Sequence, residues 1–130
     1  MDRNGISVIE VSEERAVLKS EIIDDFLNPY GYVHGGLLFT LADCAAGMLA
    51  RTDGRKYVTQ TANVNFIANV KDGTIIAKAS FVSRKNVCRL CMLKFIGWIH
   101  FWQILHSICT AFRQCNQKRA MFQEYSNLPR

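Results

Sequence analysis

Proline and glycine are scarce in this sequence, at 2 and 8 of 130 residues, and no internal repeat or linker occurs before residue 88. With 49% hydrophobic and 21% charged residues, the composition excludes collagen-like chains, low-complexity linkers and disordered tails. No apolar stretch follows Met1–Gly5, so the sequence predicts no secretory signal peptide. The five cysteines are an odd number, which favours free thiols in a reduced, cytoplasmic protein. A chain of this length suits one domain, over residues 1–130.

Acidic residues are nearly missing from the last third of the chain. Residues 88–130 contain six basic residues and one acidic residue, Glu124, whereas residues 1–87 contain ten of each. The same segment holds four of the five cysteines and both tryptophans. The net charge of +5 therefore comes from this atypical segment alone. It lacks a regular pattern of stacking aromatic residues, so we expect no nucleic-acid partner.

The hydrophobic pattern of residues 6–83 predicts an α+β domain. Alternating residues predict strands at 6–11 and 16–22 that form a hairpin, and leucines and alanines at helical spacing predict a buried helix over about residues 35–51. A run of β-formers predicts a strand at 56–70, and Asp72-Gly73 predicts a hairpin turn into a returning strand at 74–83. This order predicts one antiparallel sheet wrapped around a single long helix.

One acidic residue, Asp43, lies inside the apolar helix. An ionised carboxylate is costly to bury without a partner, so Asp43 either pairs locally on a polar edge of the helix or takes part in chemistry. His34-Gly35-Gly36 begins the helix, where backbone N–H groups lack acceptors, and the glycines let a substrate oxygen approach them. An oxyanion site and a nearby carboxylate are what acyl transfer requires.

The run Asn28-Pro29-Tyr30-Gly31-Tyr32-Val33-His34-Gly35-Gly36-Leu37-Leu38-Phe39-Thr40-Leu41-Ala42-Asp43 resembles the signature of hotdog-fold thioesterases of the phenylacetate-degradation type. That signature is an Asn, then His-Gly-Gly six residues on, then Leu-x-Asp within the helix. Residues 58–67 are similar to the strand that follows the helix in this family. The resemblance covers about residues 4–87 and implies hydrolysis of acyl-coenzyme A thioesters at sites on a subunit interface.

The resemblance also implies a role for each matching residue. The N–H of Gly35 would polarise the thioester carbonyl, and Asp43 of the neighbouring subunit would act as nucleophile or as base for a water. Asn28 would help place the water or the carbonyl. Thr59 stands where some members use a serine to orient the water, although it is also an ordinary strand residue. His34 would support the loop or touch the thioester, unless it is only a structural histidine.

The substrate and the protein itself are the expected partners. Gly36 would lie against the substrate, and Arg84 and Lys85 would meet the coenzyme A phosphates, although a solvated turn explains these two equally well. The family implies no metal and no redox cofactor, since coenzyme A is part of the substrate. It implies a homodimer or a dimer of dimers. We expect no membrane association.

Residues 88–130 lack the alternation and the turn expected of the family's last two strands. We favour the interpretation that this segment is out of frame relative to the family. A divergent helix is a second interpretation, and a membrane span over Leu90–Phe112 is a third, disfavoured by its polar residues. A zinc site is also disfavoured, because its second ligand pair has poor spacing. The candidate ligands are Cys88, Cys91, His100, His106, Cys109 and Cys115.

Three functions are compatible with these residues. The first is a thioesterase that cleaves a medium-size or aromatic acyl-coenzyme A. The second is a non-catalytic acyl-coenzyme A-binding module or a defective family member. The third is a dehydratase on the same fold, which we disfavour because such enzymes usually pair a histidine with an acid, whereas Asp43 lies in the thioesterase position.

Overall fold

One helix and one antiparallel sheet make up the part of the chain that the computed structural model describes, residues 5–66, 68–84, 88–97 and 108–114. A short 3-10 turn, Asp24–Phe26, precedes the helix. The elements in chain order are β1 (Ile6–Val11), β2 (Arg15–Glu21), α1 (Gly35–Ala50), β3 (Tyr57–Asn63), β4 (Thr74–Arg84), β5 (Cys88–Gly97) and β6 (Ile108–Gln114).

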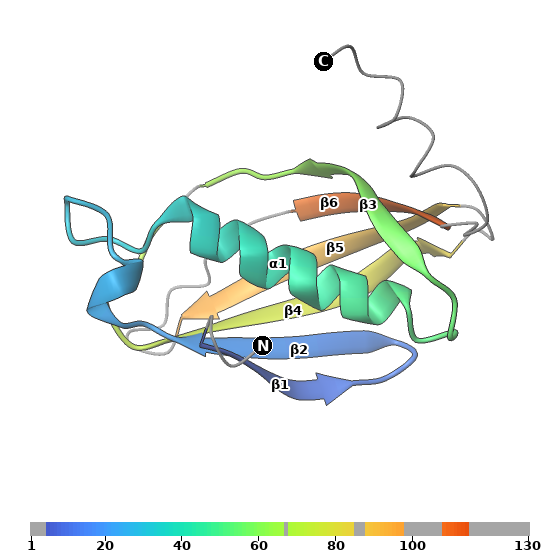
Figure 1. Cartoon of the computed structure of the whole chain (residues 1–130), viewed down its shortest axis with the longest axis horizontal. Coiled ribbons are helices and arrows are strands. Elements are labelled where there is room, and N and C mark those ends of the chain that lie inside the picture. Colours follow the sequence, from blue (N-terminus) through green and yellow to red (C-terminus); the bar gives the residue numbers. More distant parts are fainter. Residues whose placement is uncertain (1–4, 67, 85–87, 98–107, 115–130) are drawn as a thin grey trace, which may run out of the picture.

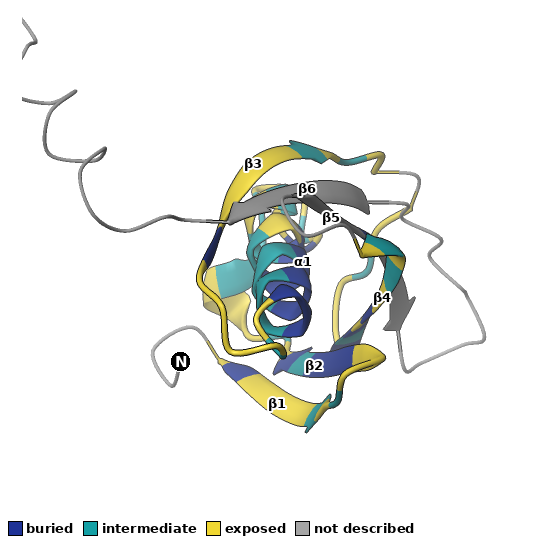
Figure 2. Cartoon of the chain, turned by 90° about the vertical axis from the view of Figure 1, so that its right-hand side faces the viewer, coloured by how far each residue is buried: buried dark blue, intermediate teal, exposed yellow. Residues whose placement is uncertain are grey.

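The sheet curves around the helix. Its strands pair antiparallel in the order β1-β2-β4-β5-β6-β3, so β1 and β3 form its two edges. Helix α1 crosses one face of this sheet (Figure 1). Seen nearly end-on in Figure 2, α1 has β1 and β2 on one side and β3 on the opposite side. The structure thus confirms the predicted α+β fold, an antiparallel sheet wrapped around one long helix.

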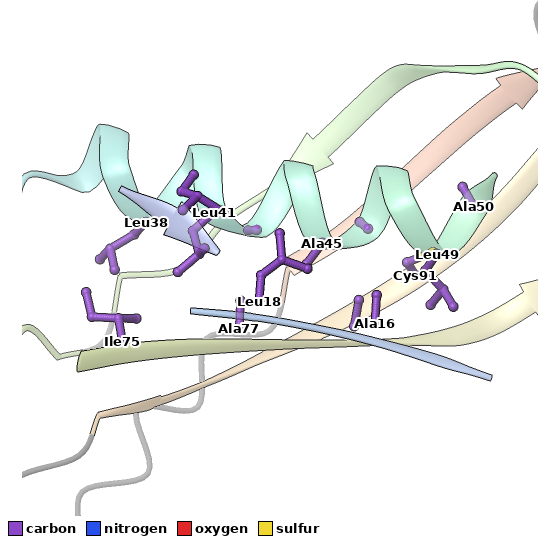
Figure 3. Close-up of a cluster of buried hydrophobic side chains, with 14 of the residues drawn as sticks. Ala16, Leu18, Leu38, Leu41, Ala45, Leu49, Ala50, Ile75, Ala77 and Cys91 are labelled. Carbon is purple, nitrogen blue, oxygen red and sulfur yellow. The ribbon is translucent and has the colours of Figure 1, made fainter. Parts of the chain in front are cut away.

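The core forms where α1 packs on β2 and β4. On the strands, alternate residues face the helix: Leu18 lies opposite Ala77 and Ala16 opposite Ala79, and all four are buried. On the helix, buried residues recur at spacings of three and four, as one face of an α-helix requires. Many of these residues are alanines, and their small side chains let the helix lie close to the sheet. The helix contributes Leu38, Leu41, Ala42, Ala45, Ala46, Leu49 and Ala50 to the core, part of which is drawn in Figure 3.

The prediction of a hairpin between the strands on either side of Lys71-Asp72-Gly73 is wrong. The first strand ends at Asn63 instead of residue 70, and β3 pairs with β6, not with β4. Both edges of β4 are already taken, by β2 and by β5. The Asp-Gly turn is still present, with Gly73 at φ +89°. However, the backbone oxygen of Gly73 accepts a hydrogen bond from the N–H of Ile22, the residue after β2. The turn therefore lies beside the end of β2 and does not connect β4 to β3 as a hairpin.

Residues 88–97 and 108–114 form strands β5 and β6, which the sequence did not predict. The helix interpretation is wrong for these two segments, since β5 pairs with β4 and β6 joins β5 to β3. In the described part of the chain, no helix is both long enough and apolar enough to cross a membrane. The remaining residues of the tail lie outside the described residues. The interpretation that the tail is out of frame concerns the coding DNA and stays a prediction.

Replacing Leu41 by alanine tests the packing of α1 on the sheet. Leu41 is fully buried at the middle of the helix, so Leu41→Ala should lower the free energy of unfolding by about 3 kcal/mol. Val82→Ala, at a side chain that is 55% exposed, is the control and should change it by less than about 0.5 kcal/mol. Urea denaturation measures both values. Equal effects of the two substitutions would contradict this description of the core.

Candidate active site

The N-terminus of α1 leaves one backbone amide available. His34 is the N-cap residue, and its Nδ1 accepts a hydrogen bond of 3.1 Å from the N–H of Gly36. The N–H of the first helical residue, Gly35, has no acceptor among the described residues. It lies at the positive end of the helix dipole, where a partly negative oxygen is favoured. The amide of Gly36 is thus held by the cap and that of Gly35 is not, and the predicted roles of Gly35 and Gly36 toward the substrate stay predictions.

Asn28 supports the loop before the helix and keeps a free donor. Its Oδ1 accepts hydrogen bonds from the N–H groups of Tyr30, at 2.9 Å, and Tyr32, at 3.1 Å. Two backbone donors on one atom fix which end of the amide is oxygen. The Nδ2 group therefore points away from these bonds, and within the described chain it has no acceptor. An amide with its oxygen engaged and its NH₂ free can donate to a carbonyl or a water.

A second loop is hydrogen-bonded to the segment before the helix. After β3, the side-chain amide of Asn69 donates to the backbone oxygen of Val33 at 2.8 Å, and the N–H of Val33 donates to the oxygen of Val70 at 2.9 Å. The ammonium of Lys71 lies 4.6 Å from the centre of the Tyr32 ring. We call residues 64–66 and 68–71 the strap. Because the strap holds Val33, it fixes the position from which His34 and Gly35 begin the helix.

The carboxylate of Asp43 is held by Thr59. The hydroxyl of Thr59, on β3, donates a hydrogen bond of 2.7 Å to Oδ1 of Asp43. Asp43 is half-buried, less enclosed than the apolar sequence around it suggested, because its side of α1 is turned toward the edge strand β3. No cation of the described residues forms an ion pair with it. The structure thus brings Asp43 and Thr59 together, and Oδ2 of Asp43 has no partner among the residues that the structure describes.

A β-bulge lies next to this pair. The pairing of β3 with β6 shifts between Thr59 and Thr61, which leaves Gln60 as an extra residue. Such bulges bend a strand and redirect its side chains. The bulge therefore lies where the strand presents Thr59 to the helix.

Asp43 and Gly35 of one protomer are too far apart to act on the same carbonyl. They are eight residues apart on one helix, and a rise of about 1.5 Å per residue separates them by about 12 Å. A reacting carbonyl needs the oxyanion donor at about 3 Å from its oxygen and the attacking atom at about 3–3.5 Å from its carbon. A single protomer therefore cannot bring these two groups to one carbonyl.

Arg84, one of the two basic residues predicted to bind coenzyme A, lies away from the start of the helix. Arg84 ends β4, beside the end of the sheet where β1 turns into β2, and its guanidinium donates to the backbone oxygen of Glu13 at 2.6 Å. It also lies 4.4 Å from the centre of the Phe81 ring. Within one protomer, Arg84 is thus engaged by its own neighbours. Lys85 lies outside the described residues. Its role and that of Arg84 stay predictions.

Three of the six candidate zinc ligands lie outside the described part of the chain. In the part that is described, no three His, Cys, Asp or Glu residues come together as metal ligands. Cys44 on α1 is a free thiol, and Cys91 on β5 is buried. The candidates outside the described residues are His100, His106 and Cys115. The zinc site therefore stays a disfavoured prediction from the sequence.

Known proteins share both this fold and part of this sequence. Residues 30–87 match the model of the thioesterase superfamily. ComA2 of Bacillus subtilis, which carries the name of an esterase, is 33% identical over 89 residues, or 64% of this chain and 71% of ComA2. A 1,4-dihydroxy-2-naphthoyl-CoA hydrolase of Listeria monocytogenes is 29% identical over 82 residues, or 60% of this chain and 66% of the hydrolase.

Solved structures show the same arrangement of helix and sheet. The PaaI protein of the Escherichia coli phenylacetic acid degradation operon superposes with a TM-score of 0.81 at 20% identity, over 88% of this chain and 82% of PaaI. A protein of Streptococcus pneumoniae, described as a hypothetical thioesterase and solved with coenzyme A, gives a TM-score of 0.78 at 20% identity over 88% of each chain.

The curved sheet around one long helix, with a carboxylate on that helix, defines a hotdog-fold protein of the thioesterase type. The chain belongs to the thioesterase superfamily. This membership and the names of the relatives support hydrolase activity on a thioester.

The thiol of Cys44 gives a measure of the charge on Asp43. Burial, and next the charge of Asp43, raise the pKa of the Cys44 thiol, so little thiolate forms near neutral pH. Asp43→Asn removes the effect of the Asp43 charge on the pKa of this thiol. It should speed alkylation of Cys44 by iodoacetamide at pH 8 by about threefold, the size expected of one partly screened neighbouring charge. Peptide mass spectrometry measures the rate at Cys44 alone. Asp72→Asn, at an exposed loop residue, is the control, and equal rates in all three proteins would contradict an ionised Asp43 beside Cys44.

Proposed function

We propose that this protein hydrolyses an acyl-coenzyme A thioester to a free acid and coenzyme A, with Asp43 as the reacting carboxylate. The observation that carries the proposal is the hydrogen bond of 2.7 Å from Thr59 to Oδ1 of Asp43, which orients the carboxylate and leaves Oδ2 for the reaction. The superfamily and the relative named as a CoA hydrolase support this chemistry. The neighbour solved with coenzyme A supports the choice of coenzyme A as the thiol.

The carbonyl of the substrate binds at the start of α1. Its oxygen accepts from the N–H of Gly35, and the Nδ2 group of Asn28 adds a second donor to the carbonyl or to the water. These donors stabilise the negative charge that develops on the oxygen as the carbon becomes tetrahedral. His34 fixes the direction of the Gly35 amide by capping the helix. The strap fixes the same amide by holding Val33.

The reaction needs only these groups and a water. In the base mechanism, Oδ2 of Asp43 takes a proton from the water as the water oxygen attacks the carbonyl carbon. The carbon–sulfur bond then breaks, and the coenzyme A sulfur leaves with the proton that Asp43 received. In the nucleophile mechanism, Oδ2 itself attacks the carbon, the carbon–sulfur bond breaks, and coenzyme A leaves as a thiolate. A water then hydrolyses the acyl–aspartate, which restores the carboxylate of Asp43 and releases the free acid and a proton that the thiolate takes up. Both mechanisms use the oxygen that Thr59 leaves free.

The site is completed by a second copy of the chain. Because one protomer separates Gly35 from Asp43 by about 12 Å, the Asp43 that serves a given Gly35 comes from the partner protomer. Strand β3 is an edge of the sheet and carries Thr59, so an antiparallel copy placed along this edge brings Asp43 and Thr59 toward the partner's helix start. A homodimer, or a dimer of such dimers, is the assembly that the proposal requires.

The variant Asp43→Asn should lower kcat by about a thousandfold, the usual loss of a general base or nucleophile. It should still bind the thioester, because the carbonyl donors are unchanged. Thr59→Val should lower kcat by about tenfold, as expected for the loss of one hydrogen bond to a charged group. Loss of the thioester ultraviolet absorbance measures the rate without interference from the protein's own cysteines.

Asp72→Asn is the matched control and should leave kcat unchanged. Hydrolysis that survives in Asp43→Asn would remove Asp43 from the mechanism. Binding of the thioester by the unaltered protein without hydrolysis would instead favour the alternative function, a non-catalytic acyl-coenzyme A-binding module.

A further inference from the structure

The side-chain amide of Asn69 is inserted between two backbone groups that could otherwise bond each other. In an antiparallel hydrogen-bonded pair, one residue uses both its N–H and its oxygen to bind the residue opposite. The N–H of Val33 does donate directly to the oxygen of Val70, at 2.9 Å. The return bond is indirect, because the N–H of Val70 donates to Oδ1 of Asn69 at 2.8 Å and Nδ2 of Asn69 donates to the oxygen of Val33 at 2.8 Å. The amide of Asn69 thus sets the distance between the strap and Val33.

The residue that Asn69 holds is enclosed on all sides. Val33 is fully buried, and a buried backbone oxygen that loses its donor is costly. On the other side of this segment, the N–H of His34 donates to the backbone oxygen of Phe26 at 2.8 Å. Two loops therefore hold the residues that precede the helix. The side chain of Asn69 is not part of the described hydrophobic core, so its replacement leaves the packing of α1 on the sheet intact.

The strap also contacts Gly35 itself. A side chain at Gly35 would begin 3.3 Å from Cζ and 3.4 Å from Cε1 of the Phe66 ring, which is tighter than ordinary van der Waals contact. Phe66 and Asn69 are three residues apart in the chain, so the distance at which Asn69 holds the strap also affects how the ring meets Gly35. A strap displaced toward Val33 would therefore push this ring against the residue whose N–H binds the substrate carbonyl in the proposed reaction.

We propose that Asn69 is a positioning residue, whose inserted amide holds the strap at the distance that directs the N–H of Gly35 at the substrate carbonyl; this inference rests on the proposed function. Val33 is two residues before Gly35, so a displacement of Val33 changes the direction of the Gly35 N–H. A hydrogen bond weakens steeply as its angle becomes less linear. Because the carbonyl oxygen gains negative charge as the reaction proceeds, a misdirected donor costs more in the transition state than in the bound substrate.

The kinetic test compares the unaltered protein with Asn69→Asp. This variant keeps Oδ1 but removes the NH₂ donor and places a carboxylate oxygen against the oxygen of Val33. The value of kcat should fall by about tenfold, while KM changes by less than about twofold. Ser80→Asp, which adds the same charge at an exposed position of β4, is the control and should leave both values unchanged. An unchanged kcat in Asn69→Asp overturns the inference.

Infrared spectroscopy tells positioning apart from a purely structural role. Benzoyl-CoA and hexanoyl-CoA, each labelled with carbon-13 at the carbonyl, are bound to Asp43→Asn and to the double variant Asp43→Asn with Asn69→Asp. A hydrogen bond from the Gly35 N–H lowers the stretching frequency of the bound carbonyl, and the double variant should lose about half of this lowering. A role of Asn69 in stability alone would change the fraction of bound thioester but not the frequency. Equal frequencies in the two proteins overturn the inference.

These measurements separate the inference from the proposed function. If the unaltered protein binds the thioesters but hydrolyses neither, the proposed function fails, and the carbonyl frequency still decides the role of Asn69. If it hydrolyses them and the frequency is the same with and without Asn69→Asp, the inference alone fails. Absence of binding of both thioesters overturns both. If Asn69→Asp does not fold, as thermal melting would show, Asn69→Ala is measured in its place under the same criteria.

Discussion

The hydrogen bond between Thr59 and Asp43 is the interaction on which the proposed chemistry depends. It joins the helix to the edge strand, and it can form because α1 buries its alanine and leucine face on β2 and β4 and turns Asp43 toward β3. An unpaired carboxylate within an apolar segment would be destabilising, but Asp43 is only half-buried and accepts one hydrogen bond, which leaves its other oxygen without a partner among the described residues. The same helix places Gly35 about 12 Å away, so the proposed mechanism needs a second protomer.

The local parts of the site could be predicted from the sequence. His34-Gly35-Gly36 at the start of a helical pattern indicates a helix start with free amides, and Asp43 stands out because its neighbours are apolar. The roles of Asn69 and Phe66 could not be predicted. The partner of Asn69 is Val33, 36 residues earlier, and Phe66 reaches Gly35 across a similar distance in sequence. Contacts of this kind depend on how the loops pack, and no local sequence pattern predicts them.

In the fold, too, local features were easier to predict than contacts between distant residues. The first hairpin and the helix were predicted closely, because alternation and helical spacing are local signals. The pairing of β3 was predicted wrongly, because Asp72-Gly73 indicates a tight turn but not which strand the turn serves. Strands β5 and β6 were missed since their residues do not alternate clearly, and their pairing with β4 and β3 is a property of the whole sheet. Sequence patterns thus identified the helix and several strands better than they identified which strands pair.

The most direct test of the account mixes two inactive subunits. Asn28→Asp keeps the oxygen that holds the loop but removes the NH₂ donor, and Asp43→Asn removes the reacting carboxylate. Co-expression with two affinity tags gives mixed dimers, in which one of the two sites combines an intact Asn28 with an intact Asp43. We predict that an equal mixture of subunits recovers about a quarter of the unaltered rate, because half of the dimers are mixed and each has one complete site. Purified mixed dimers that remain as inactive as either variant alone would contradict it.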